Sequence, residues 1–120
     1  MTKRSMGELE AAVMDVLWDQ GGWLTPGEVH RLLADADLAY TTVMTVLVRL
    51  WRKGRVERQR DGRAYAYHPV ATREQHAARR MEEILMAARD RPAVLSHFLD
   101  AMEAADRDQL RRLLKGHRPR

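Results

Sequence analysis

The sequence contains no cysteine. This absence excludes disulfide bonds, thiolate metal ligands and cysteine nucleophiles, and it fits a reducing compartment. Long apolar runs are absent as well. The N-terminal segment MTKRSMGELEAAVM carries two glutamates where a signal peptide needs an uninterrupted apolar core. No stretch approaches the roughly 20 apolar residues of a membrane span. We therefore expect no membrane insertion and a cytoplasmic location.

Patterns typical of catalysis and metal binding are missing too. The serines, Ser5 and Ser96, do not lie in a nucleophile-elbow setting. The histidines do not fall at a metal-ligand spacing; they are His30, His68, His76, His97 and His117. We predict that the chain is not an enzyme and that it holds no metal and no cofactor.

The charge of the chain is concentrated in one segment. The 120 residues suit one compact domain, or a small domain with an assembly segment, and their net charge of +4 is modest. Residues 49–63, however, contain seven Lys and Arg against two acidic residues, a local charge of +5. Such a basic stripe favours a nucleic-acid partner.

Two capping-box patterns predict where the first helices begin. Ser5-Met6-Gly7-Glu8 and Thr25-Pro26-Gly27-Glu28 each place a hydroxyl three residues before a Glu. The apolar residues that we expect to face inward from these helices are Leu9, Val13, Val16 and Leu17, then Val29, Leu32 and Leu33. Gly21-Gly22 ends the first helix, and Asp35-Ala36-Asp37 turns the chain into a longer helix, which together predict a helix-turn-helix.

The longer helix, residues 39–53, has two different faces. Val43, Val46, Leu47 and Leu50 recur at three- and four-residue spacing, whereas the other face carries Thr41, Thr42, Thr45, Arg49 and Arg52. A solvated helix surface is the simpler interpretation, but β-branched Thr is a poor choice for it. We predict that this face reads DNA, with Thr41 alternatively serving as the cap of its own helix.

A β-hairpin with a basic tip follows the helix. Val56 to Arg60 alternate in character, Asp61-Gly62 is a strong turn signal, and AYAYH returns before Pro69. Arg60 and Arg63 lie near the tip, where phosphate or minor-groove contact competes with a merely solvated turn. Tyr65 and Tyr67 share a strand face that indicates packing rather than base stacking, and the three tryptophans, Trp18, Trp23 and Trp51, are predicted at the core or its edge.

The C-terminal part predicts three further helices, one beginning at a Thr72-Arg73-Glu74-Gln75 box, one after Pro92 and one capped near Asp106. Their apolar stripes are too wide to hide against one another, so we expect a homodimer. The predicted dimer residues are Met81, Ile84, Leu85, Val94, Leu95, Phe98, Leu99, Met102, Leu110, Leu113 and Leu114. The predicted fold is mainly α with a small β-hairpin wing: a winged helix-turn-helix at residues 1–70, then a helical dimerisation domain at residues 71–120.

AYTTVMTVLVRLWRKG at residues 39–54 and the DGRAYAYHP hairpin resemble the penicillinase-repressor family, which includes the methicillin-resistance and copper-responsive repressors. The similarity also covers GELEAAVMDVLW at residues 7–18 and extends in pattern to the C-terminal helices. The resemblance implies a winged-helix homodimer that silences an operon. It further implies operator contacts at Thr41, Thr42, Met44 and Thr45, with Arg60 and Arg63 near the wing.

The resemblance also implies a route of induction. Copper-responsive members carry paired cysteines near the C-terminus, and their absence here favours the β-lactam branch. In that branch a membrane sensor with a cytoplasmic zinc protease triggers cleavage within the dimerisation part. The corresponding segment is residues 94–99, with the bond between His97 and Phe98 as the match.

These features lead to one main hypothesis and two alternatives. The main hypothesis is a homodimeric repressor that binds palindromic double-stranded operator DNA and is relieved by proteolysis in response to a cell-wall antibiotic or similar signal. A general nucleic-acid-binding or architectural protein would instead show a steep salt dependence and little sequence discrimination. A winged helix used only to bind protein would tolerate the loss of Thr45 and Arg49.

Overall fold

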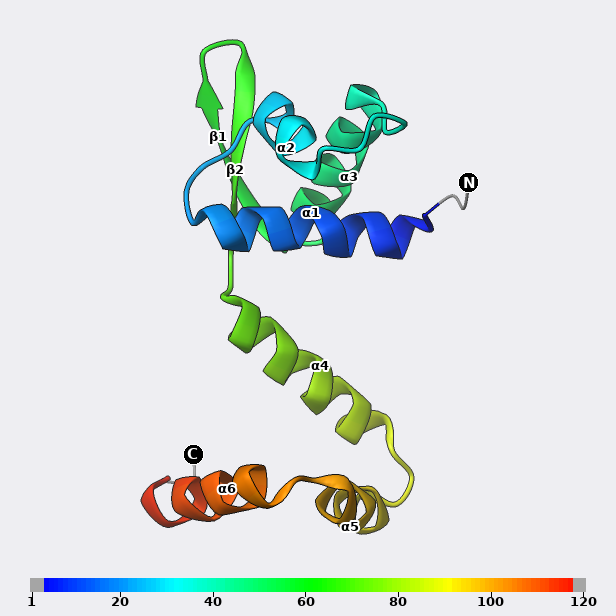
Figure 1. The fold of residues 1–120 in the computed structure, drawn as a ribbon, viewed down its shortest axis with the longest axis vertical. Helices are drawn as coiled ribbons and strands as arrows, with labels where there is room; N and C mark the ends of the chain where they lie inside the picture. Colours follow the sequence, from blue (N-terminus) through cyan, green and yellow to red (C-terminus); the bar gives the residue numbers. More distant parts are fainter. Residues whose placement is uncertain (1–3, 118–120) are drawn as a thin grey trace. The chain divides into compact units, whose positions relative to one another are not determined.

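The computed structural model describes residues 4–117 and divides the chain into two compact units, one ending at His76 and one beginning at Ala77. Figure 1 shows helices throughout and a single antiparallel hairpin, which confirms the predicted fold class. The elements are α1 (Met6–Gln20), α2 (Pro26–Leu33), α3 (Tyr40–Arg52), β1 (Val56–Asp61), β2 (Ala64–Pro69), α4 (Arg73–Ala87), α5 (Arg91–Ala101) and α6 (Ala104–Gly116).

The first two helices begin at the predicted caps. Ser5 Oγ accepts a hydrogen bond from the Glu8 amide at 3.1 Å, and Thr25 and Glu28 form a reciprocal capping box. These bonds satisfy amides that have no partner within the helix. The first helix ends at Gly21, whose φ of 73° is the left-handed conformation that glycine adopts without a steric penalty.

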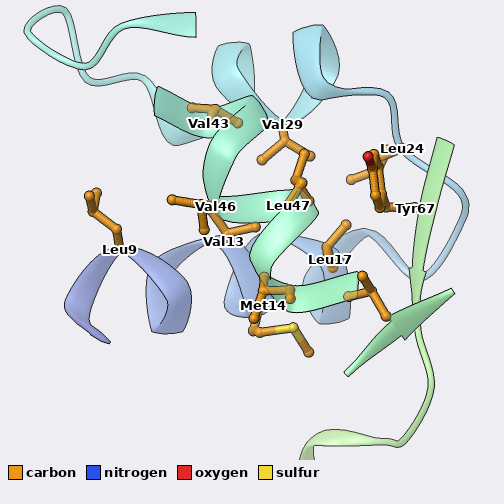
Figure 2. Packing of buried hydrophobic residues seen from close by; sticks show 12 residues of the cluster. Leu9, Val13, Met14, Leu17, Leu24, Val29, Val43, Val46, Leu47 and Tyr67 are labelled. Atoms are coloured by element: carbon orange, nitrogen blue, oxygen red, sulfur yellow. The ribbon is translucent and has the colours of Figure 1, made fainter. Parts of the chain in front are cut away.

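The core of the first unit lies where α1, α2 and α3 meet, with side chains from the hairpin closing it (Figure 2). The fully buried side chains include Leu17, Val29, Leu47 and Leu50. Leu32 was expected inside, but this is wrong, because it is 41% exposed. The short α2 turns one narrow face inward, and Val29 occupies it.

Strand β2 of the hairpin is paired on both of its edges. Val56 pairs with Pro69, and the register continues to Asp61 opposite Ala64, so Gly62 and Arg63 form the turn. On its other edge β2 pairs with Leu24, since the Tyr67 amide donates to the Leu24 carbonyl at 2.7 Å and the Leu24 amide donates to the Tyr67 carbonyl at 3.0 Å. The turn therefore lies one residue later than the Asp61-Gly62 signal indicated, and the hairpin is anchored to the segment before α2.

The second unit contains most of α4 and the whole of α5 and α6. Thr72 and Gln75 form the predicted reciprocal cap of α4, and Asp90 caps α5 by accepting from the Ala93 amide at 3.0 Å. The cap of α6 was expected near Asp106; the N-cap is Glu103, three residues earlier, and Asp106 lies in the first turn. There its carboxylate still favours the positive end of the helix dipole. Among residues 4–117, no helix has the length and apolar character needed to cross a membrane.

Candidate nucleic-acid interface

Helix α3 is divided sharply into a buried and an exposed face. Its inward side chains, Val43, Val46, Leu47 and Leu50, are at most 1% exposed. The opposite face exposes Thr41, Met44, Thr45 and Arg49 and half-buries Thr42. The structure therefore brings all the predicted helix contacts onto one side of one helix, which the core holds from the other side.

The N-terminal end of α3 has no side-chain cap. Its N-cap is Ala39, whose carbonyl accepts from the amides of Thr42 and Val43, and Thr41 lies inside the helix. The alternative in which Thr41 caps its own helix is therefore wrong, because the N-cap lies two residues earlier, at Ala39, and the helix starts at Tyr40. Thr41 is left with an exposed side chain on the proposed contact face.

The hydroxyl of Thr45 is already engaged by the helix. Its Oγ1 donates to the Thr41 carbonyl at 3.0 Å, the backbone hydrogen bond that Thr commonly makes one turn back. The hydroxyl proton is thereby used, whereas the oxygen lone pairs and the methyl group remain. Thr45 thus offers a groove an acceptor and an apolar contact of the kind that suits a thymine methyl.

The turn between α2 and α3 is fixed by His30. Its Nε2 lies 2.6 Å from the Leu38 carbonyl oxygen, and its ring meets the Tyr40 ring edge-on at 6.2 Å. A carbonyl can only accept, so Nε2 carries the proton. Ala34 begins the turn in the left-handed conformation with φ 51°. These contacts set the direction in which α3 leaves the turn.

The hairpin forms a wing whose turn extends beyond the helices of its own unit (Figure 1). Arg60 lies on β1 opposite Tyr65, and Arg63 lies in the turn; both are exposed. The aromatic residues share a strand face, as expected, with Tyr67 buried and Tyr65 packed partly against the core. The wing thus presents arginines at and beside its turn, while Tyr67, further from the turn, is packed in the core.

The basic stripe is not uniformly available to a ligand. Lys53 Nζ binds both carboxylate oxygens of Glu10, at 2.7 and 2.8 Å, and Arg55 Nη2 lies 2.9 Å from His76 Nε2. Within residues 4–117, none of the stripe's arginines forms an ion pair with a carboxylate. The exposed ones are Arg49, Arg52, Arg60 and Arg63, and Arg58 is half-buried.

One acidic group near the interface has a shifted pKa. The hydrogen bond from the Thr25 amide, followed by that from the Thr25 hydroxyl, lowers the pKa of Glu28 from its ordinary value. Both donors favour the charged carboxylate. Glu28 therefore supports the start of α2 in its ionised form.

The predicted dimer residues lie on α4, α5 and α6. Leu85, Met102 and Leu110 are partly exposed and the others are exposed, and none of the described residues from 77 to 117 is buried. Five of them, Met81, Phe98, Met102, Leu110 and Leu113, line a hollow of about 530 Å³ within this unit. The His97–Phe98 bond lies in the middle of α5, and both side chains are exposed.

Sequence reasoning missed two sets of contacts. One is the Glu10–Lys53 ion pair, which ties α1 to the end of α3. The other joins Trp51 of α3 to the wing through Arg58 and Tyr65. The ion pair joins residues 43 positions apart, which no sequence pattern indicates. The contacts of Arg58 are only seven residues apart, and the pair of diagonal neighbours Arg58 and Tyr65 could have been found from the hairpin register.

Comparison with known proteins gives concordant results. The family model of the penicillinase repressor matches residues 6–116. The transcriptional regulator BlaI of Mycobacterium tuberculosis, from strains CDC 1551 and H37Rv, is 47% identical over 113 residues, which span 91% of this chain and 82% of that protein.

Two solved structures are also similar. The solution structure of the DNA-binding domain of the repressor BlaI is 28% identical, covers 61% of this chain and 90% of its own, and has a TM-score of 0.49. A MarR family protein from Bacillus stearothermophilus is 23% identical, with coverages of 90% and 69% and a TM-score of 0.41. The family match and the regulator identity confirm the resemblance seen in the sequence and the prediction of a regulator rather than an enzyme. The chain belongs to the penicillinase repressor family.

Proposed function

We propose that the protein is a sequence-specific repressor that reads operator DNA with α3. The observation that carries this proposal is the exposed face of Thr41, Met44, Thr45 and Arg49, backed by a fully buried opposite face. Burial on one side fixes the helix, so its outer side chains are presented to a groove without a large ordering cost. A repressor of this kind works where operator DNA is, so we also propose a cytoplasmic location.

The side chains on this face suit different parts of a duplex. Thr41, Thr42 and Thr45 offer hydroxyl oxygens and methyl groups, and Met44 adds apolar surface, all of which can meet base edges in a major groove. Arg49, two turns from the start of α3, is placed for a phosphate, and Arg60 and Arg63 on the wing for a phosphate or a minor groove. Base reading thus falls to the helix start and backbone contact to the arginines.

We further propose that residues 71–120 form a dimerisation domain, with residues 1–70 as the DNA-binding domain. Support comes from the exposed apolar side chains of α4, α5 and α6, of which Ile84 is 65% and Leu114 71% exposed. A second copy would cover these apolar side chains with its own equivalent side chains, because a two-fold interface uses the same surface of both subunits. A dimer would carry two copies of α3 to successive major grooves of a palindromic operator.

The dimer is tested by sedimentation at micromolar concentration. Leu113→Glu, which changes a 49% exposed side chain beside the hollow, is expected to give a monomer with an intact fold. Arg112→Glu is the control at a neighbouring exposed position of α6 that does not line the hollow; it makes a larger change of charge but should leave the dimer. A monomeric wild-type chain would contradict the proposal, whatever its affinity for DNA.

Proteolytic relief by a membrane sensor metalloprotease is the form of induction that we propose. The His97–Phe98 bond divides α5 between its apolar residues, so a cut there would separate Val94 and Leu95 from Phe98 and Leu99. Loss of that apolar face would shift dimer to monomer and remove the gain from two linked half-sites. Mass spectrometry of chains from cells treated with a cell-wall antibiotic tests this; a chain that stays intact throughout induction contradicts it.

Operator binding is tested by fluorescence anisotropy with duplexes from the protein's own upstream region and with scrambled duplexes. We expect a strong preference for the upstream region. Thr45→Ala removes a base contact, so it should reduce the difference in binding free energy between upstream and scrambled DNA by about 1 to 3 kcal/mol. Arg49→Gln should weaken binding to both duplexes. Equal affinity for upstream and scrambled DNA would instead favour a general nucleic-acid-binding protein, and insensitivity to both substitutions would favour a protein-binding adaptor.

A further inference from the structure

Arg58 is stacked on two aromatic rings from different elements. Its Cζ lies 3.6 Å from the centroid of the Trp51 ring on α3 and 4.1 Å from that of the Tyr65 ring on β2. Arg60 continues the series, with its Cζ 5.4 Å from the Tyr65 centroid. We name Trp51, Arg58, Tyr65 and Arg60 the cation–aromatic ladder. It joins the last turn of α3 to the wing.

The stacking holds Arg58 without neutralising it. Across residues 4–117, the guanidinium forms no ion pair, and its N–H groups have no hydrogen-bond acceptor. A ring face binds a guanidinium through its π electrons, whereas a carboxylate partner would use the N–H groups and cancel the charge. Arg58 is therefore half-buried and restrained by two rings, and it still presents a complete planar set of donors.

These properties suit an anion whose oxygens lie in the plane of the guanidinium group. A phosphate oxygen pair matches the guanidinium fork, and a side chain that is already restrained loses less entropy when it binds. Trp51 lies on the helix proposed to read bases, and Arg60 leads to the wing turn. A DNA strand contacted by both α3 and the wing would pass the ladder between them.

We propose that Arg58 binds a phosphate of the operator backbone, with Trp51 and Tyr65 as the positioning residues that hold it. This inference rests on the proposed function, and it adds to that function a backbone contact between the reading helix and the wing tip. A phosphate contact sets the register of the helix on the duplex and carries no sequence information itself. The rings do not serve as a platform for stacked bases here, because Arg58 covers a face of each.

The experiment measures the affinity of the full-length chain for upstream and scrambled duplexes across a series of salt concentrations. Arg58→Gln should weaken binding to both by about tenfold and reduce the magnitude of the negative slope of log affinity against log salt by about 0.9 for each copy bound. Arg58→Lys keeps the charge, so the slope should stay while affinity falls. Arg89→Gln, which removes the same charge from an exposed position in the second unit, should change neither value.

The role of the positioning residues is tested by a variant of Tyr65 and its matched control. Tyr65→Leu removes a ring but no charge, so it should weaken binding at an unchanged slope, whereas Tyr65→Phe keeps the ring and should bind like wild type. Thermal unfolding of each variant confirms that the measured chain is folded. Trp51→Leu should behave like Tyr65→Leu.

Two results separate this inference from the function on which it rests. If wild type prefers its upstream duplex but Arg58→Gln keeps the wild-type salt slope, the ladder is only structural and the inference is overturned while the repressor proposal stands. If wild type shows no preference for the upstream duplex, the proposed function itself fails. The inference is supported if the salt slope becomes less steep with Arg58→Gln and stays at the wild-type value with Arg89→Gln.

Discussion

The ion pair between Glu10 and Lys53 gives an asymmetric prediction. Glu10 is buried in α1 with 7% of the residue exposed, whereas the Lys53 side chain, at the end of α3, is 48% exposed. Lys53 Nζ bonds both oxygens of the carboxylate, at 2.7 and 2.8 Å. Removing the lysine therefore leaves a buried charge unpaired, while removing the carboxylate leaves an ammonium that can turn to water.

The magnitudes follow from this difference in exposure. Breaking a fully buried pair by removing one partner costs about 3 to 5 kcal/mol, and the half-exposed lysine here reduces that figure. We expect Lys53→Met, which keeps the apolar stem, to lower the free energy of unfolding by about 2 kcal/mol. Glu10→Gln keeps an acceptor for the lysine and should cost about 1 kcal/mol.

Urea denaturation of both single variants and the double variant measures these values. The double-mutant cycle should give a coupling of about 1 kcal/mol, because the two residues share one interaction. The slope against urea should stay constant, which shows that the same surface is exposed on unfolding. Equal costs for the two single variants, or a coupling indistinguishable from zero, would refute the reasoning from exposure.

Three further predictions concern the first unit. Leu47→Ala removes a side chain that is 0% exposed and should lower the free energy of unfolding by about 3 kcal/mol, measured by denaturation; a cost under 1 kcal/mol would mean that the core collapses around the gap. Gly62→Ala places a side chain at φ 63° in the wing turn and should cost about 1 kcal/mol, whereas an unchanged stability would show that the turn has another conformation. Because the fold lowers the pKa of Glu28, its ionised form stabilises the protein above about pH 4.5, and this contribution is lost as the pH falls through the lowered folded pKa. The difference in melting temperature between wild type and Glu28→Gln should therefore shrink from pH 7 to pH 3, and a constant difference would contradict the assigned cause.

The local signals of the sequence predicted the elements well where the cause is local. The Ser5 and Thr25 caps and the Thr72 box act within four residues, so the chain itself specifies where those helices begin. The same holds for the buried stripe of α3, since Val43 and Leu47 repeat with the period of the helix. The starts of α3 and α6 were not specified in this way, because their N-caps, Ala39 and Glu103, make no side-chain cap hydrogen bond, and they lie two and three residues before Thr41 and Asp106.

Other features depended on how elements meet. Leu32 repeats with the helical period, but the width of the face that α2 turns to the core left it 41% exposed. Arg58 and Lys53 belonged to one basic stripe in the sequence, yet one stacks on aromatic rings and the other pairs with Glu10, 43 residues away. No periodicity carries such information, because partners at long range are chosen by packing.

The sequence by itself determined the family, the helix-turn-helix with its hairpin, and the exposed Thr and Arg face of residues 39–53, because these follow from caps, periods and a characteristic run of residues. The tertiary structure alone decided which cations are still available to a ligand. Lys53 forms an ion pair with the carboxylate of the buried Glu10, while Arg58 stacks on two rings and its N–H donors are unpaired within residues 4–117. The physical reason is that a charge is neutralised or restrained only by groups within a few ångströms, and the fold of the chain sets those neighbours.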